Sequence, residues 1–243
     1  MKQRALLVRA VAMSSTSKPT LRIDWATHEA AKFACEKWHY SKTLPVGKLV
    51  KVGAWEDGKF IGVVLFAWGA NKSLGSPYGL EMTECCELVR IALTNHATPV
   101  SRITAFAMKF LRKQSPGLRL IVSFADPSAG HHGGIYQAGN WLYSGTCAAT
   151  FEYRLNGSRL NKRAYTGNQF GKIGSKTSIP AGAVKVDVPG KHRYLMPLDS
   201  EMRAKIATLA KKYPKRVKKQ DSEHHSELGG AVPTDTLQIH EAS

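Results

Sequence analysis

The sequence predicts an α/β domain in which helices flank a mixed β-sheet. Asp57-Gly58, a strong turn signal, joins two apolar segments and predicts an antiparallel hairpin. From residue 86 to residue 147, apolar segments of strand length then alternate with segments of helical period. The longest apolar run, Ile61 to Ala70, has strand length and contains Gly62 and Gly69, so the sequence shows no membrane span.

The first half of the chain supplies the hairpin and its neighbours. Residues 21–24 read as a short strand, and an amphipathic helix follows from Thr27, a suitable N-cap, to about residue 39. Residues 51–55 and 60–68 are the two strands of the hairpin, and the glycines and proline of residues 70–80 indicate a loop.

The second half supplies the alternating segments. We expect a buried strand at 86–94, a helix at 99–114, a buried strand at 118–125, a short helix after a glycine and histidine loop within 131–139, and a strand at 141–147. From residue 151 the chain reads as irregular, apart from a strand at 193–198 and a closing helix at 200–212 with Asp199 or Ser200 as N-cap.

The positive charge is unevenly distributed. The net charge is +17, and residues 151–219 hold 17 Lys and Arg against 4 Asp and Glu. Such a concentrated surplus predicts a polyanionic partner, namely nucleic acid. We therefore divide the chain into a flexible leader (1–20), a catalytic core (21–150), a basic segment that completes the fold and binds nucleic acid (151–219), and a disordered acidic tail (220–243).

The four cysteines, Cys35, Cys85, Cys86 and Cys147, show no C-x-x-C pair and no zinc-site spacing. We interpret them as reduced and mostly buried thiols of a cytosolic protein.

Four segments together resemble the Mom proteins of Mu-like phages over roughly residues 21–200. The segments are His39-Tyr40-Ser41, Glu87-Leu88-Val89-Arg90, Ser123-Phe124-Ala125-Asp126-Pro127 and Gly134-Ile135-Tyr136-Gln137-Ala138-Gly139-Asn140-Trp141. The resemblance implies an acyltransferase-like fold of the GNAT type. It also implies conversion of adenine in double-stranded DNA to N6-carbamoylmethyladenine in the host cytoplasm, which protects phage DNA from restriction.

The acyl donor is left open by the sequence. GNAT enzymes normally place a glycine-rich loop after the central strand, where backbone N–H groups hold the pyrophosphate of coenzyme A. Here the predicted strand is followed by Asn95-His96-Ala97-Thr98-Pro99, which contains no glycine, and the proline removes one donor. The donor is therefore either acetyl-CoA or, as in other GNAT-like transferases without this loop, an aminoacyl-tRNA. The carbamoylmethyl group has a glycine skeleton, which points to glycyl-tRNA.

Four residues are candidates for catalysis, because the adenine amine is a poor nucleophile that needs a base and an oxyanion donor. Asp126, at the end of a buried strand, is our first candidate for the base or for orienting the amine; a turn cap is the alternative. Ser123 is either a hydrogen-bond donor in the site or a packed strand serine. His39 and Tyr40 are candidates for proton transfer and for binding adenine, although a histidine there can simply cap a helix.

The remaining candidates bind substrate. Arg90, within a buried strand, requires a partner, which is either a substrate anion or Glu87. Tyr136, Trp141 and Tyr143 are candidates for stacking an extruded adenine, with core packing as the alternative. The residues expected to contact phosphates are Arg154, Arg159, Lys162, Arg163, Lys211, Lys212, Lys215 and Arg216. His131, His132, Asp126 and His39 have metal-ligand chemistry but loose spacing, so we predict no catalytic metal.

Two other functions remain open at this point. A non-enzymatic DNA-binding or packaging protein would need only the charge. An ordinary N-acetyltransferase using acetyl-CoA would need the pyrophosphate loop that this sequence lacks.

Overall fold

The computed structural model describes residues 18–68, 73–160 and 179–216. The predicted acidic tail, nearly all of the predicted leader, and Lys162 and Arg163 therefore lie outside the described residues.

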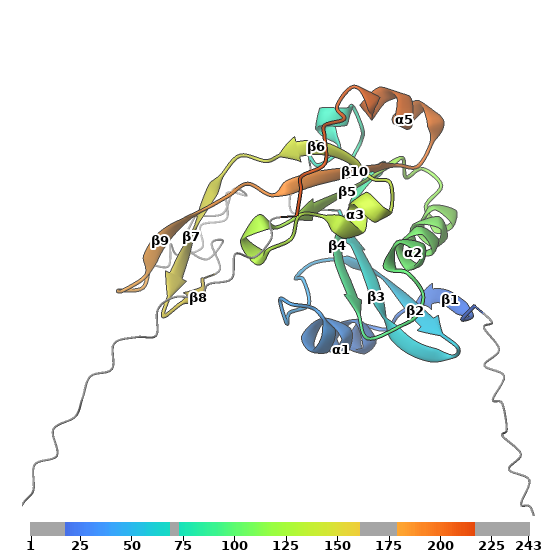
Figure 1. Cartoon of the computed structure of the whole chain (residues 1–243), viewed down its shortest axis with the longest axis horizontal. Coiled ribbons are helices and arrows are strands. Elements are labelled where there is room, and N and C mark those ends of the chain that lie inside the picture. Colours follow the sequence, from blue (N-terminus) through green and yellow to red (C-terminus); the bar gives the residue numbers. More distant parts are fainter. Residues whose placement is uncertain (1–17, 69–72, 161–178, 217–243) are drawn as a thin grey trace, which may run out of the picture.

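A seven-stranded sheet forms the centre of the protein (Figure 1). Its strands, in spatial order, are β1 (Leu21–Trp25), β2 (Leu49–Glu56), β3 (Lys59–Ala67), β4 (Cys85–Leu93), β5 (Leu120–Ala125), β10 (His192–Pro197) and β6 (Leu142–Thr146). Among the described pairings in this sheet, only β4 and β5 run parallel. The predicted mixed sheet is confirmed, and the Asp57-Gly58 turn joins β2 to β3 as expected.

Helices cover both faces of the sheet. They are α1 (His28–Trp38), α2 (Val100–Gln114), α3 (Gly134–Ala138) and α5 (Ser200–Ala207). The buried side of α1 packs with Val63 and Leu65 of β3, whereas α2 packs with Val64 and Phe66. Because alternate residues of a strand point to opposite faces, α1 and α2 lie on opposite faces of the sheet. Thr27 caps α1 by accepting a hydrogen bond from Ala30 N, as predicted.

A β-bulge interrupts the middle of β4. Arg90 pairs with Leu65 and Leu88 pairs with Phe66, which leaves Val89 as the extra residue. On the other side of β4, pairing with β5 runs from Cys85 opposite Leu120 to Leu88 opposite Ser123 and extends no further. The two parallel strands therefore separate immediately beyond the bulge.

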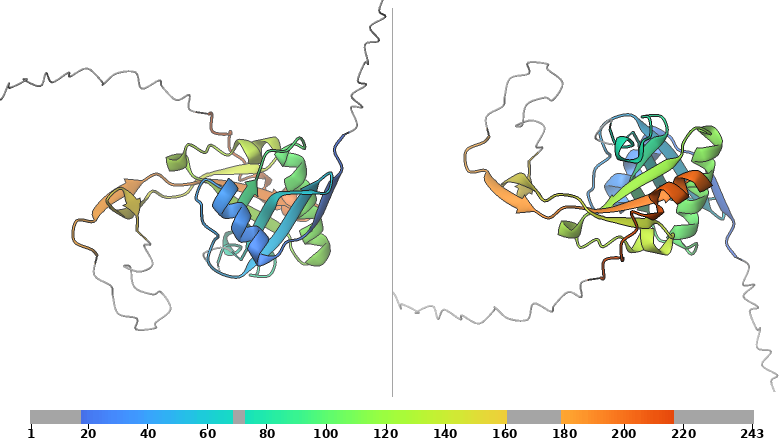
Figure 2. Two further views of the ribbon diagram at one scale, coloured as in Figure 1. Left: turned by 90° about the horizontal axis from the view of Figure 1, so that it is seen from below. Right: turned by 90° about the horizontal axis from the view of Figure 1, so that it is seen from above.

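Residues 150–188 contain a second, three-stranded sheet, which the sequence analysis missed. Its strands are β7 (Thr150–Leu155), β8 (Ser158–Arg159) and β9 (Val184–Val188), in the order β8-β7-β9. Figures 1 and 2 show this sheet projecting from the core as an arm. The prediction of an irregular segment was wrong because the charged residues concealed a strand alternation, in which Phe151 and Tyr153 flank Glu152. The strand predicted at 193–198 is β10, in the centre of the main sheet.

The closing helix is shorter than predicted. Asp199 caps α5 by accepting from Met202 N, but the helix ends at Ala207 rather than at residue 212. Residues 208–216, here called the C-terminal strap, instead run along β6. Lys211 N donates to Tyr143 O at 2.8 Å, and the Tyr213 hydroxyl donates to Trp141 O at 2.7 Å. Pro214 disfavours helix at the residue before it, which agrees with an extended strap.

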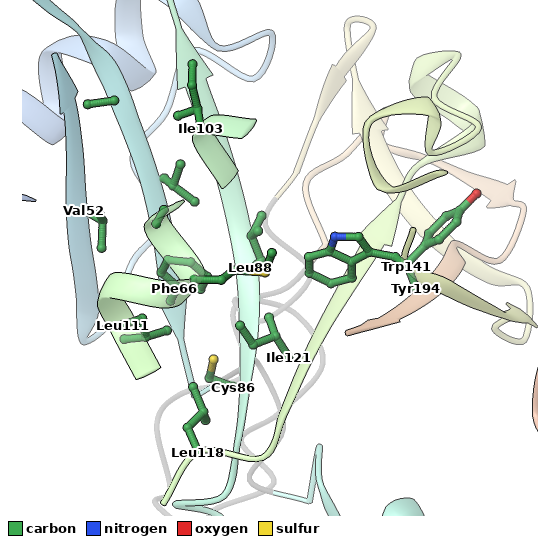
Figure 3. Packing of buried hydrophobic residues seen from close by; sticks show 14 of the residues in the cluster. Val52, Phe66, Cys86, Leu88, Ile103, Leu111, Leu118, Ile121, Trp141 and Tyr194 are labelled. Carbon is green, nitrogen blue, oxygen red and sulfur yellow. The ribbon is translucent and has the colours of Figure 1, made fainter. Parts of the chain in front are cut away.

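The largest buried cluster joins α2 to the sheet and to the region around Trp141 and Tyr194. Figure 3 shows Trp141 within this cluster, with its indole directed toward Leu88. Cys35, Cys85 and Cys86 are buried free thiols, as predicted, and Cys147 is partly exposed. No helix in the described part of the chain has the length and apolarity needed to cross a membrane.

Candidate functional site

A cavity of about 580 Å³ opens where β4 and β5 separate. Its walls are residues 87–91 of β4, residues 124–126 at the end of β5, the end of α1 with Tyr40, the glycine-rich segment 130–136, and two basic residues, Lys191 and Arg216. The volume is in the range of small-molecule sites. The carboxyl end of a parallel strand pair is also where open α/β sheets commonly bind ligands.

The bulge at Val89 positions Arg90 in the cavity wall. Arg90 Nη1 donates to the carbonyl of Val89 at 2.7 Å, and its Nε is buried without a hydrogen-bond partner among the described residues. A buried unsatisfied donor of a charged group is costly, so this guanidinium is suited to an acceptor brought by a ligand. Glu87, the other candidate partner, lines the same cavity.

His39 is a neutral hydrogen-bond donor in this geometry. The backbone N–H of Ser41 donates to His39 Nδ1 at 3.1 Å, and Ser41 Oγ lies 2.8 Å from the same nitrogen. Because Nδ1 accepts, the ring proton is on Nε2. Burial, helped by the positive charge of Arg90, lowers the pKa of His39 to about 4. The ring thus differs from the proton-transfer group that the sequence suggested: at neutral pH it offers an N–H.

Tyr40 and His131 form an aromatic pair in the cavity wall. Their ring centroids are 4.7 Å apart, and Tyr40 also contacts His39 at 4.3 Å. Tyr40 is 58% exposed, so its face is accessible to an incoming ring. A purine base stacks favourably on such side chains. Tyr40, which the sequence analysis named as a candidate for binding adenine, thus presents an accessible ring at the cavity.

Ser123 packs inside the sheet and does not line the cavity, in agreement with a packed strand serine, the second of the two roles that the sequence left open. Its Oγ lies 2.8 Å from the carbonyl oxygen of Leu88 and 2.7 Å from the phenol oxygen of Tyr136. The carbonyl oxygen can only accept, so the Ser123 hydroxyl donates its proton to Leu88 O, and the Tyr136 hydroxyl donates to Ser123 Oγ. Burial raises the pKa of Tyr136 to about 12, which keeps that phenol protonated. Ser123 thus connects β4, β5 and α3 at the base of the cavity.

Asp126 contributes a carboxylate to the cavity. Its Oδ1 accepts from Ser128 N at 3.0 Å, as the N-cap of the short 3-10 helix η2 (Pro127–Ala129). Its Oδ2 lies 3.4 Å from Lys191 Nζ. Turn capping and presence in the site, which the sequence analysis treated as alternatives, therefore occur together. Lys191 had not been singled out, although it immediately precedes β10.

Gly133 allows the glycine-rich segment to pass against Tyr194. Its φ is +86°, and a Cβ there would lie 2.2 Å from the Tyr194 ring. The carbonyl of His132 accepts hydrogen bonds from the Tyr194 hydroxyl and from Gln137 Nε2. Gln137 Nε2 also lies 3.2 Å from the carbonyl of Pro214. These contacts hold one wall of the cavity and the C-terminal strap together.

Of the three predicted stacking residues, only Tyr136 lines the cavity. Trp141 is 1% exposed and Tyr143 is 8% exposed, and both belong to the core cluster. Tyr136 contacts Trp141 and Tyr194 at centroid distances of 5.1 and 5.0 Å. Trp141 and Tyr143 therefore follow the core-packing alternative, and they support the cavity wall from behind.

The predicted phosphate-binding residues occupy different environments. Arg154 and Arg159 both form ion pairs with Glu152, at 2.7 and 2.8 Å, on the arm. Lys211, Lys212, Lys215 and Arg216 are exposed on the C-terminal strap, and Arg216 also lines the cavity. Among the described residues, no three His, Cys, Asp or Glu side chains gather as a metal site would require.

The turn between β4 and α2 already holds a carboxylate of the chain. Glu56, at the end of β2, accepts from Ala97 N at 2.8 Å and from Thr98 N at 2.7 Å. These hydrogen bonds lower the pKa of Glu56 and keep its carboxylate ionised, and the bond from Ala97 N has the largest effect. The N-cap of α2 is Pro99, which has no N–H to offer. The residues present at this turn therefore do not fit a coenzyme A pyrophosphate.

The mixed sheet, its single parallel pair among the described strands, and the cavity beyond a β-bulge define a mixed α/β fold, in agreement with the GNAT-type fold that the sequence resemblance implies. The chain belongs to the Mom protein family, which matches residues 20–215.

A curated relative, "Methylcarbamoylase mom" of Escherichia phage Mu, is 28% identical over 141 residues, which span 56% of this chain and 58% of the relative. Two solved structures are also similar. A putative acetyltransferase from Acinetobacter baylyi ADP1 has 11% identity and a TM-score of 0.40, covering 75% of this chain and 94% of its own. The N-acyl amino acid synthase FeeM, from uncultured soil microbes, has 13% identity and a TM-score of 0.42, covering 80% and 98%.

Proposed function

We propose that this protein is a phage DNA-modification enzyme that converts adenine in DNA to N6-carbamoylmethyladenine and so protects the DNA from restriction. The observation that carries the proposal is the cavity at the separation of β4 and β5, in a chain of the Mom family. The cavity combines three kinds of group: the aromatic ring of Tyr40 for stacking, the carboxylate of Asp126, and the hydrogen-bond donors of His39 and Arg90. A protein that only packages DNA has no use for this combination.

We further propose glycyl-tRNA as the donor. The support comes from the β4–α2 turn, where Glu56 takes the two backbone N–H groups that a pyrophosphate would need. A donor that is itself a nucleic acid also agrees with the net charge of +17. The same turn disfavours an N-acetyltransferase that uses acetyl-CoA.

The proposed reaction has two steps that balance without a further reactant. First, the adenine N6 attacks the glycyl ester carbonyl. A C–N bond forms, the ester C–O bond breaks, Asp126 takes the amine proton and the tRNA 3′-oxygen leaves as a hydroxyl. Second, the free glycyl amine attacks ring carbon C6 through a five-membered ring. The original C6–N6 bond then breaks, and N6 becomes the nitrogen of the carbamoyl group.

In these steps the protein would position groups and stabilise charge. The N–H of His39 Nε2 and the guanidinium of Arg90 are donors for the oxyanion that forms at the glycyl carbonyl. Tyr40 would hold the extruded base by stacking. The Asp126 carboxylate, whose Oδ2 lies 3.4 Å from Lys191 Nζ, would be the proton acceptor.

The test is a reaction of protein, duplex DNA and tRNA charged with ¹⁵N-glycine, followed by mass spectrometry of the nucleosides. We expect modified adenine with the label on the nitrogen attached to C6, so that loss of the carbamoyl group in fragmentation leaves the label on the base. Label in the carbamoyl nitrogen would refute the ring step. No labelled adenine at all would refute the donor.

Asp126→Asn provides a matched variant. The amide oxygen still accepts from Ser128 N, but the group no longer takes a proton. We expect modification to fall at least 100-fold while DNA affinity stays near that of the wild type. Equal loss of both properties would make Asp126 a structural residue only.

A further inference from the structure

A second cavity, of about 500 Å³, lies outside the proposed active site. One wall is the exposed side of α2, with Ser101, Arg102, Ala105, Lys109 and Arg112. The other wall consists of residues 138–140, at the end of α3 and just after it, and residues 196–198 at the end of β10. We call it the α2 groove.

The α2 groove is cationic. Its lining contains three basic residues, Arg102, Lys109 and Arg112, and no Asp or Glu. At positions i, i+7 and i+10 these three share one face of the helix, and all are exposed, while Ile103, Ala107 and Leu111 are buried on the other side. Ala105 between them has a small side chain, which leaves room for a ligand to approach the helix.

The size of this face suits a polyanion better than a small anion. At a rise of 1.5 Å per residue, Arg102 and Arg112 are about 15 Å apart along the helix axis. One strand of duplex DNA carries a phosphate about every 3.4 Å along its axis, so a stretch of about five phosphates has a similar length.

The groove is next to the proposed active site but separate from it. Residues 133–136 line the catalytic cavity, whereas residues 138–140 line the α2 groove, so α3 stands between the two. Along β10 the two cavities lie at opposite ends, with Lys191 just before the strand in one and Pro197 at its last residue in the other. A backbone bound in the groove would therefore lie across α3 from a base bound in the cavity.

We propose that the α2 groove binds the phosphodiester backbone of duplex DNA next to the target adenine. The proposal rests on DNA being the substrate of the neighbouring site. It assigns to Arg102, Lys109 and Arg112 a part of the DNA affinity that the sequence analysis had attributed only to residues after 150.

The test compares two triple variants by fluorescence anisotropy with duplex DNA between 50 and 200 mM salt. The groove variant is Arg102→Gln, Lys109→Gln, Arg112→Gln. The control, Lys32→Gln, Lys37→Gln, Lys59→Gln, removes the same charge from α1, on the opposite face of the sheet, and from the start of β3. If all three groove residues neutralise phosphates, the slope of log affinity against log salt falls by about 2.7.

In the groove variant the loss of affinity between these two salt concentrations should then be about 40-fold smaller than in the wild type. The control should retain the wild-type slope. An unchanged slope in the groove variant, or an equal change in both variants, would overturn the proposal. So would a loss of affinity for tRNA with none for duplex DNA, since the groove would then serve the donor.

The binding assay needs no turnover, so it separates this proposal from the proposed function. If the DNA is never modified but the groove variant shows the reduced slope, the function fails and the groove remains a DNA-binding surface. Arg112→Glu alone is a second variant, for the case that the triple variant does not fold. It should weaken DNA binding more than Lys59→Glu does.

Discussion

His39 provides the sharpest test of the proposed site, because its geometry assigns it as a donor and not as a base. Two substitutions separate these roles. His39→Gln retains an N–H near the position of Nε2, whereas His39→Asn retains an acceptor near Nδ1 for the Ser41 N–H but removes the outer donor. Loss of one oxyanion donor typically lowers kcat by about 10²–10³-fold.

We therefore expect the Asn variant to lose roughly that factor in adenine modification and the Gln variant to retain most of its activity. Single-turnover rates with DNA and charged tRNA at pH 7 would measure the difference. If the two variants are equally inactive, His39 moves a proton and the assignment of the Nε2–H tautomer to catalysis is wrong.

The same residue predicts how stability depends on pH. The pKa of His39 is about 4 in the folded protein, against 6.5 as the ordinary value. The unfolded chain therefore binds the proton more readily, and stability that is present above pH 6.5 is lost as the pH falls toward 4. A shift of this size corresponds to about 3 kcal/mol. Urea unfolding from pH 7 to pH 4 should show this loss in the wild type but not in His39→Gln.

His28→Gln is the control for this measurement, because His28 is an exposed histidine at the start of α1. It should follow the wild type across the whole pH range. An acid dependence that persists unchanged in His39→Gln would show that other groups cause it, and would contradict the burial argument for His39.

Two further predictions concern the backbone around the site. Glu56→Ala should lower the free energy of unfolding by about 1.5–3 kcal/mol in urea unfolding, because two hydrogen bonds to a charged group are lost. Coenzyme A should not raise the melting temperature of the wild-type protein. A clear rise would contradict our interpretation of the β4–α2 turn. Gly133→Ala should lower the melting temperature more than Gly130→Ala does. Both glycines have positive φ, but a Cβ at residue 133 would meet the Tyr194 ring, whereas nothing lies within 4 Å of a Cβ at residue 130. Equal effects would mean that backbone strain alone decides the cost.

The sheet was predictable because each strand carries its own local signal. The Asp57-Gly58 turn determines the hairpin, and the apolar segments that became β4 and β5 are long enough to be recognised as buried strands. The arm was missed because its alternation of apolar and polar residues is mixed with a high density of charge. The end of α5 was missed because the strap is held by tertiary hydrogen bonds to Trp141 and Tyr143, and no local sequence pattern predicts such bonds.

The site was predictable only in part, for a similar reason. Residues at strand ends, such as Asp126, are placed by the strand itself, and Arg90 is placed by a bulge next to it. Whether an aromatic residue faces the cavity or the core depends on the rotation of its element against the rest of the fold. Tyr136 and Trp141 are five residues apart, yet only the first lines the cavity. Lys191 was missed because it reaches the site from a distant part of the sequence.

The described basic residues after residue 150 differ in whether their charge is paired or exposed. Arg154 and Arg159 are paired with Glu152, so the described part of the arm is less basic than its composition suggests. The strap, in contrast, exposes Lys211, Lys212, Lys215 and Arg216 along β6 and ends at the cavity. Since the Gln137 side chain contacts both the strap and the His132 carbonyl in the cavity wall, an anion bound on the strap would be coupled to the wall of the proposed active site. The strap would thus contribute to positioning the nucleic acid at the reacting base, in addition to its contribution to affinity.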